Sequence, residues 1–230
     1  HLTRFFDIKN LGGMEEGIIQ LNYNAKKFNV KNDILCTSTK NALFKYENMN
    51  VIQCKESFTL ASNVFSLEFY KIFKKIFFKY NFIHIHYPYP FADFTVFLNR
   101  KNLKSKIILT YHLDIVRQKL LKKFYLYFFK NFFSKYISLV NVSSELYYNT
   151  SEIKKSISSD KNFFIQKLGL KDISEYNYNL EQLNNEPLRK FFEVHEKVSF
   201  FMARDKHYKG FDRLKYLLEN NLDKPFVVCT

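Results

Sequence analysis

The chain has little cysteine and no long uncharged apolar run. Its three cysteines, Cys36, Cys54 and Cys229, are scattered and show no C-x-x-C spacing. This excludes a disulfide framework and a zinc finger, and it fits a reducing compartment. No uncharged apolar run reaches the ~18 residues that a membrane-spanning helix needs. A signal peptide and an initiator Met are also missing, and both ends read as strand, so we expect a fragment cut at both ends.

Acidic residues are few relative to basic ones. The chain has 36 Lys and Arg against 22 Asp and Glu, a formal net charge of +14, with 47% hydrophobic residues. A basic excess favours anionic partners such as phosphorylated ligands, an anionic membrane surface or nucleic acid. Because the common residues are those that A/T-rich codons encode, codon bias explains the lysines equally well. No nucleic-acid-binding signature is visible, so no nucleic acid partner is expected.

Short apolar runs alternate with segments of helical periodicity, which predicts an α/β fold with a doubly wound parallel sheet. The predicted strands lie near 34–36, 51–53, 82–86, 107–110, 139–143 and 163–165. The predicted helices are 14–27, 64–80, 115–136 and 144–155. Residues 1–170 therefore form one Rossmann-like domain, the Asn-rich stretch 171–193 a linker or short connecting helix, and residues 194–230 the start of a second domain.

A polar cluster directly follows the apolar strand 107–109. Its polar members are Thr110, Tyr111, His112 and Asp114, with Leu113 between the last two. The strand therefore delivers polar side chains to its carboxyl edge, which is where open α/β sheets bind ligands. A histidine there can donate or accept a hydrogen bond near neutral pH. His112 is therefore a candidate ligand-binding residue, with a structural histidine as the alternative.

Two further junctions could bind an anion. Gly12 and Gly13 precede the first helix, where free backbone N–H groups suit a phosphate, although a plain turn reads the same way. The second junction has Arg204 at the end of a strand and Lys209 at the start of a helix, a plausible diphosphate clamp or a solvated basic loop. The dinucleotide fingerprint G-x-G-x-x-G is absent.

Taken in order, these segments resemble family-4 glycosyltransferases of the two-Rossmann (GT-B) type. Residues 11–15 resemble the glycine loop of that family, 82–88 its "DIIHVHxP" strand, and 110–118 the "TYHSDIVRQ" segment of a bacterial O-antigen subgroup that uses mannose-like sugars. The stretches 142–144, 168–170 and 201–204 with 209–210 resemble "ATS", "PLGID" and "FVGRL…KG". Ala203 and Lys167 depart from the family pattern, and the chain stops before its E-x7-E element.

The resemblance implies a retaining, metal-independent hexosyltransferase. Residues 1–170 would be the acceptor side and 194–230 the beginning of the domain that binds a nucleotide-diphosphate sugar. His112 would be catalytic, and Gly12, Gly13, Arg204 and Lys209 would bind the donor phosphates. The acceptor would be a lipid-linked saccharide, with Tyr111, Asp114 and Glu15 assigned to substrate binding. The resemblance implies no cofactor beyond the sugar donor. It places the protein in the cytoplasm or on the inner face of the cell membrane. The fragment alone would be inactive.

Three other interpretations remain open. His84 and His86 point to the same side of one strand, but no third metal ligand is evident, which favours a structural role. A non-catalytic basic module that binds anions or membranes is the main alternative. Another Rossmann enzyme, such as a dehydrogenase or epimerase, is disfavoured because neither G-x-G-x-x-G nor a Tyr-x-x-x-Lys pair is present.

The helix predicted over 115–136 is rich in aromatic and basic residues. We expect its buried face to be Leu121, Phe124, Tyr125, Phe128 and Phe132. The opposite face would carry Lys119, Lys123 and Lys130 with Leu126 and Tyr127. Basic residues among exposed aromatics suit an anionic bilayer surface, and a solvated charged face is the alternative.

Overall fold

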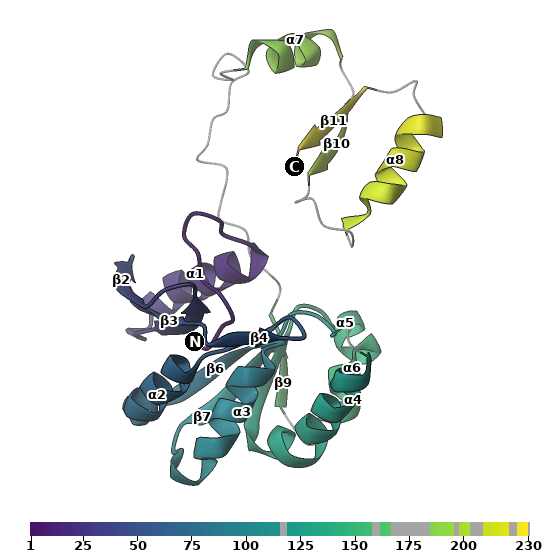
Figure 1. The fold of residues 1–230 in the computed structure, drawn as a ribbon. Helices are drawn as coiled ribbons and strands as arrows, with labels where there is room; N and C mark the ends of the chain where they lie inside the picture. The colour runs from purple at the N-terminus through teal and green to yellow at the C-terminus, as the bar shows by residue number, and fades with distance from the viewer. Residues whose placement is uncertain are drawn as a thin grey trace. The chain divides into compact units, whose positions relative to one another are not determined.

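The structure is a computed structural model that describes residues 1–115, 119–157, 162–166, 185–195, 198–202, 209–220 and 225–229. The chain divides into two compact units, His1–Lys171 and Asp172–Thr230. The first unit contains one large sheet with helices on both faces (Figure 1).

The sheet of the first unit runs parallel except at one edge. Its strands are β1 (Asp33–Ser38), β2 (Ala42–Tyr46), β3 (Met49–Lys55), β6 (Phe82–Tyr87), β7 (Lys106–Tyr111), β8 (Ile137–Val142) and β9 (Asn162–Ile165). The order is β2-β3-β1 on one side and β6-β7-β8-β9 on the other, with β2 antiparallel to β3. A small hairpin of β4 (Phe58–Leu60) and β5 (Asn63–Phe65) is separate.

The first residues of the chain join the two halves of this sheet. Leu2 bridges Leu35 of β1 and Ile85 of β6 in parallel, and its N–H donates to the His84 carbonyl at 2.7 Å. The chain therefore opens in an extended segment, as the sequence predicted, and the bridges place this central strand between β1 and β6. From this strand the order runs outward in both directions, which creates the switch point at which doubly wound sheets bind ligands.

Helices cover the two faces of the sheet. They are α1 (Gly13–Lys26), α2 (Leu67–Ile76), α3 (Pro90–Asn99), α4 (Lys119–Phe128), α5 (Glu145–Thr150) and α6 (Glu152–Ser156). Side chains of α2, α3 and α4 share one apolar core with alternate residues of β6, β7 and β8. Helix α1 packs on the opposite face of the sheet. There Ile18 and Ile19 form a second apolar core with buried residues of β1 and β3, namely Ile34, Cys36, Met49 and Val51.

Several helices differ from their predicted extents. The segment 64–80 begins as strand β5, and its helix α2 is continued by a 3₁₀ turn, Phe77–Lys79. The segment 144–155 is interrupted at Ser151, which is both the C-cap residue of α5 and the N-cap residue of α6. Helix α3, strand β2 and the β4–β5 hairpin were not predicted, because their sequences are short and lack a clear apolar period.

The prediction for the buried face of α4 was wrong in phase. Tyr125 is buried, as is Phe129 in the π turn Phe129–Phe133 that follows. Leu121 and Phe124, expected in the core, are 48% and 67% exposed. Nearly every residue from 124 to 129 is apolar, so periodicity alone could not fix the phase.

The second unit has the β-α-β arrangement expected of an opening Rossmann-like domain. Strand β10 (Ser199–Met202) pairs in parallel with β11 (Phe226–Cys229), and α8 (Phe211–Asn220) lies between them in the chain. Helix α7 (Glu186–Val194) occupies the second half of the predicted linker, capped by the Asn185 side chain. The α/β fold with parallel strands that the sequence predicted is confirmed.

Candidate active site

His112 lies just beyond the carboxyl end of β7 and is held there by its backbone. Its N–H donates to the Tyr87 carbonyl at 3.2 Å, which extends the β6–β7 ladder by one step. Its carbonyl accepts a hydrogen bond from the Tyr147 hydroxyl of α5, also at 3.2 Å. The backbone of His112 is therefore fixed on both sides before its ring makes any contact.

A hollow of about 470 Å³, partly open to solvent, lies beside His112. Its lining comes from α1, from the ends of β6, β7 and β8, and from the residue after β9. These residues are Gly17, Leu21, His86, Thr110, Tyr111, His112, Asn141, Val142, Ser143 and Gln166. The hollow is at the carboxyl edge of the parallel strands, where ligands of open α/β sheets bind.

Three more histidines lie near His112, and one of them, His86, contacts its ring. His86 Nδ1 is 2.9 Å from His112 Nε2, and His86 Nε2 is 3.0 Å from His1 Nδ1. His84 Nε2 is 2.5 Å from the Thr110 hydroxyl. Burial lowers the pKa of His84 to about 3 and that of His112 to about 4, and it lowers the pKa of His86 well below its ordinary value. All three rings are therefore neutral at pH 7, and each can both donate and accept.

The structure corrects the statement that no third partner accompanies His84 and His86. His1, from the central strand, joins them, and one ring nitrogen of each lies within 4.8 Å of the others. Neutral imidazoles are good ligands for zinc. The contacts just described already engage these rings without a metal, because the His86–His1 and His84–Thr110 distances are those of hydrogen bonds.

Tyr111 and Asp114 hold the loop that follows β7. The Tyr111 side chain is buried on the opposite face of the sheet from His112, stacked on Tyr87, and its hydroxyl donates to the Asp114 carboxylate. Asp114 also accepts from the Glu152 backbone N–H at the start of α6, at 3.1 Å. These contacts fix the loop at the carboxyl edge of the sheet. The predicted role of Tyr111 and Asp114 in acceptor binding stays a prediction.

The glycine loop leads into α1. Gly12 is its N-cap, and the Glu15 carboxylate accepts from the Gly12 N–H at 3.0 Å, so Glu15 acts as a helix cap in this structure. A Cβ built on Gly13 would meet no atom within 4 Å, and Gly13 does not have a positive φ. Neither the backbone nor neighbouring protein atoms of the described chain demand glycine at position 13, which is the pattern expected if a ligand approaches there.

The basic clamp is only partly visible. Arg204 lies outside the described residues. Lys209 is exposed and lies just before α8, where Gly210 adopts a φ of 80° and its carbonyl accepts the N–H of Leu214. Lys209 therefore precedes a helix start as predicted, and its role in phosphate binding stays a prediction.

Sequence reasoning missed Gly17, Asn141 and Gln166. Asn141 Nδ2 contacts the Thr110 hydroxyl at 3.1 Å and Gln166 Oε1 at 2.5 Å, which carries the polar network across three strands. A usable signal existed, since Asn141 is a polar residue in a mainly apolar strand, one position before its last residue. Gly17, four residues after Gly13, falls one helical turn along the same face.

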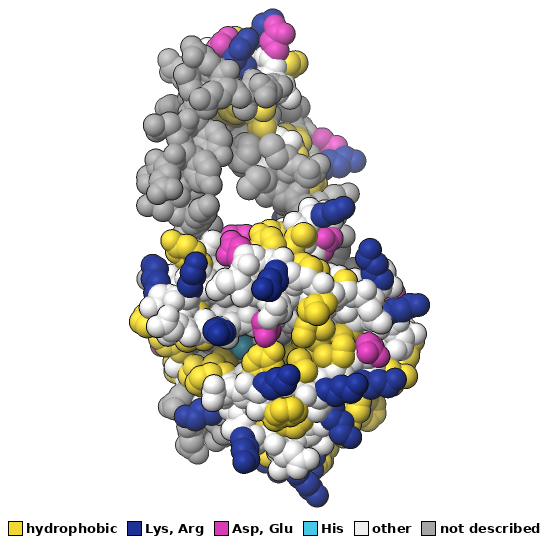
Figure 2. Space-filling view, turned by 90° about the vertical axis from the view of Figure 1, so that its left-hand side faces the viewer, with side chains coloured by type: hydrophobic (Ala, Val, Ile, Leu, Met, Phe, Trp, Pro, Cys, Tyr) yellow, Lys and Arg dark blue, Asp and Glu magenta, His cyan; other side chains and the backbone are white. Residues whose placement is uncertain are grey.

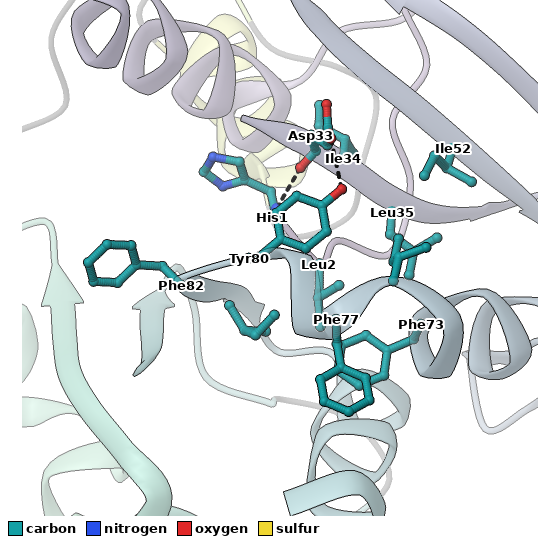
Figure 3. A pocket seen from close by; sticks show the side chains of 12 residues that line it. His1, Leu2, Asp33, Ile34, Leu35, Ile52, Phe73, Phe77, Tyr80 and Phe82 are labelled. Carbon is teal, nitrogen blue, oxygen red and sulfur yellow. Dashed lines mark hydrogen bonds between the residues drawn. The ribbon is translucent and has the colours of Figure 1, made fainter. Parts of the chain in front are cut away.

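A second hollow lies at the opposite, amino-terminal edge of the sheet (Figure 3). Its lining is mainly apolar, with Leu2, Phe73 and Phe77 among the residues. It also contains a hydrogen-bonded polar pair, in which the Tyr80 hydroxyl donates to the Asp33 carboxylate at 2.7 Å. With its one carboxylate already engaged, this hollow offers less chemistry than the carboxyl edge.

Comparison with known families decides which class of protein has this arrangement. A family model described as glycosyl transferase 4-like matches residues 17–144, more than half of the chain. The chain belongs to the glycosyl transferase 4-like family. The matched region includes β6, β7 and His112, so the resemblance seen in the sequence is confirmed.

Two curated bacterial relatives are named as transferases of mannose and of D-rhamnose. The O-antigen chain mannosyltransferase C of Escherichia coli is 34% identical over 127 residues, which cover 54% of this chain and 34% of the relative. The D-rhamnosyltransferase WbpZ of Pseudomonas aeruginosa is 28% identical over 155 residues, covering 66% and 40%. The chain thus spans between a third and two fifths of their lengths.

Among solved structures, the trehalose-6-phosphate protein of Escherichia coli bound with UDP-2-fluoro glucose matches with a TM-score of 0.57. The match covers 99% of this chain and 62% of that one at 12% identity, so it supports the GT-B fold alone. Among the described residues of this glycosyl transferase 4-like chain, no helix has the length and apolar character needed to cross a membrane.

Proposed function

We propose that this chain is part of a retaining glycosyltransferase that transfers a mannose-like hexose from a nucleotide-diphosphate sugar to a growing, lipid-linked polysaccharide. The observation that carries the proposal is His112, held by its backbone at the carboxyl edge of the parallel sheet and lining the hollow there. Membership of the glycosyl transferase 4-like family and the mannosyl- and rhamnosyltransferase relatives support the class of donor.

In this proposal each residue has a separate task. His112 hydrogen-bonds to the donor sugar at the reacting centre. The open space beside Gly13 admits the donor phosphates close to the start of α1, because the amino-terminal end of a helix favours an anion. Arg204 and Lys209 neutralise the charge that grows on the departing diphosphate, because fixed cations stabilise a leaving group best in the transition state. No metal is required.

The test is a donor screen on the full-length protein, with the reading frame continued past Thr230. Labelled GDP-mannose, GDP-rhamnose, UDP-glucose and UDP-galactose are offered with a lipid-linked saccharide acceptor, with and without EDTA. Transfer from one GDP sugar that persists in EDTA, with the anomeric configuration retained, supports the proposal. Binding of nucleotide sugars without transfer from any of them would favour the non-catalytic module instead.

Helix α4 supports a membrane-facing surface, which we call the α4 patch: Leu120, Leu121, Phe124 and Tyr127 with Lys119 and Lys123. Its four apolar side chains are 48–68% exposed, and both lysines are exposed. Exposed aromatics flanked by lysines suit an anionic bilayer, in which rings enter the interface and cations meet headgroups. By contrast, Figure 2 shows Lys and Arg spread over another face of the first unit rather than gathered in one patch.

Sedimentation with phosphatidylserine-containing vesicles tests the α4 patch. We expect salt-sensitive binding that the double variant Leu120→Ser, Phe124→Ser weakens several-fold. Leu43→Ser is the matched control, since Leu43 is 73% exposed on the edge strand β2 and lies outside the patch. Equal binding by the double variant and the control would leave the patch without a membrane role.

A further inference from the structure

His112 is one end of a row of imidazoles that crosses the centre of the sheet. Its Nε2 lies 2.9 Å from His86 Nδ1, and His86 Nε2 lies 3.0 Å from His1 Nδ1. The rings of His86 and His112 are nearly parallel, at an interplanar angle of 19°. Both nitrogens of His86 are thus engaged by other imidazoles, and its side chain is 2% exposed.

The strand register explains why these rings meet. His86 pairs with Thr110 across β6 and β7, so His112, two residues further along, emerges on the same face as His86. The central strand brings His1 beside His86 from the other side, because Leu2 accepts the His86 N–H at 3.0 Å. The row is therefore built from three segments that are fixed by backbone hydrogen bonds.

His86 and His112 are neutral, so each of these two rings carries one N–H, and each contact in the row needs one donor and one acceptor. The row therefore has a restricted set of proton arrangements. If His86 donates through Nδ1, His112 Nε2 must accept, and the proton of His112 is then on Nδ1. If His86 donates to His1 instead, His112 donates through Nε2, and its Nδ1 presents a lone pair. The partner of His86 thus decides whether Nδ1 of His112 donates or accepts.

We propose that His86 is a positioning residue that fixes the ring orientation and the tautomer of His112. The assignment of His112 to the donor sugar rests on the proposed function, whereas the contact between the two rings does not. His86 touches no reacting group in this account. It determines which hydrogen bond Nδ1 of His112 offers to a sugar hydroxyl.

Two substitutions separate the two contacts of His86. The amide of Asn stands near the position of Nδ1, so His86→Asn keeps a partner for His112. The amide of Gln reaches toward the position of Nε2, so His86→Gln keeps a partner for His1 alone. His84→Gln is the matched control, because His84 is on the same strand and face and contacts Thr110 rather than His112.

The first readout is kinetic, on the full-length protein. A loss of orientation at a reacting group costs about 10- to 100-fold in rate, so we expect His86→Gln to lower kcat by that factor with donor affinity unchanged. We expect His86→Asn to retain most of the wild-type kcat, and His84→Gln to behave like wild type. Equal kcat values for His86→Gln and His86→Asn would overturn the proposal.

The second readout does not depend on any reaction. Long-range ¹H–¹⁵N spectra of protein labelled at histidine report the tautomer of each ring. We expect a single tautomer for His112 in the wild type and in His86→Asn, and a mixture in His86→Gln. A His112 tautomer that ignores His86 overturns the inference, as does zinc bound one per chain to His1, His84 and His86. A tautomer that responds to His86 in a protein without transferase activity would leave this inference standing and remove the proposed function.

Discussion

The two faces of strands β6, β7 and β8 have opposite characters. One face carries Ile85, Leu109 and Val140, each fully buried against α2, α3 and α4. The other carries His86, Thr110 and Asn141: the His86 ring contacts His112, and the Asn141 amide contacts the Thr110 hydroxyl. Adjacent residues on the same strand thus have different surroundings: one packs in the apolar core, and the next belongs to the polar face.

Parallel strands are usually buried on both faces and read as continuous apolar runs. In this chain apolar and polar residues alternate near the carboxyl ends of these strands. The reason is that one face of the sheet builds the core and the other faces the hollow beside α1. The comparison predicts that substitutions on the apolar face change stability, and that those on the polar face change function. The substitutions described next test this difference between the two faces.

The largest expected effect on stability is at Leu109. Leu109 is fully buried, so Leu109→Ala removes core contacts and leaves a cavity, which costs about 2–5 kcal/mol of unfolding free energy. Ile108→Ala, on the other face of the same strand, is the matched control, because Ile108 is only half-buried. Urea denaturation of both variants measures the difference. Equal losses would mean that the two faces do not differ in their contribution to the core.

Asp93 is an exception on the apolar side that sharpens the comparison. It is fully buried in α3, bonded to the Tyr125 hydroxyl, and burial raises the pKa of its carboxyl from 3.8 to about 8. The unfolded chain ionises first, so the stability contributed by the protonated form is lost as the pH rises from 3.8 toward 8.

The buried histidines act in the opposite pH range. Their pKa values are lowered from 6.5, so they cost stability below pH 6.5 and contribute a constant amount above it. Between pH 6.5 and pH 8 we therefore expect the wild type to lose about 2 kcal/mol more unfolding free energy than Asp93→Asn does. Urea midpoints at both pH values decide, and an unchanged slope in the variant would contradict the assignment.

The smallest expected effect is at Gly13, where stability and function should move in opposite directions. A Cβ there meets no protein atom, so Gly13→Ala should raise the unfolding free energy by about 0.4–1 kcal/mol. The same Cβ would occupy the space proposed for the donor phosphates, and we expect nucleoside-diphosphate affinity to fall about tenfold, or ~1.4 kcal/mol. Calorimetry on the full-length protein measures the affinity; no loss would mean that the phosphates bind elsewhere.

Much of the fold could be predicted because its core strands are β-branched runs ending in polar residues. The strands around Ile85, Leu109 and Val140 and the position of His112 follow from that pattern. The face of α4 could not be predicted, since apolar residues fill the segment around Phe128 and a π turn shifts its phase. The row of imidazoles was hidden as well, because His1 and His86 are far apart in sequence and meet only through the sheet order.

The account depends most directly on His112. The deciding measurement is the rate of sugar transfer and the nucleoside-diphosphate affinity of His112→Ala in the full-length protein, beside His195→Ala as a histidine replacement outside the hollow. We expect transfer to fall by about 100-fold or more, as for the loss of a preorganised group at a reacting centre, with the affinity nearly unchanged and the control active. Unchanged turnover in His112→Ala would contradict the assignment of the carboxyl edge as the active site.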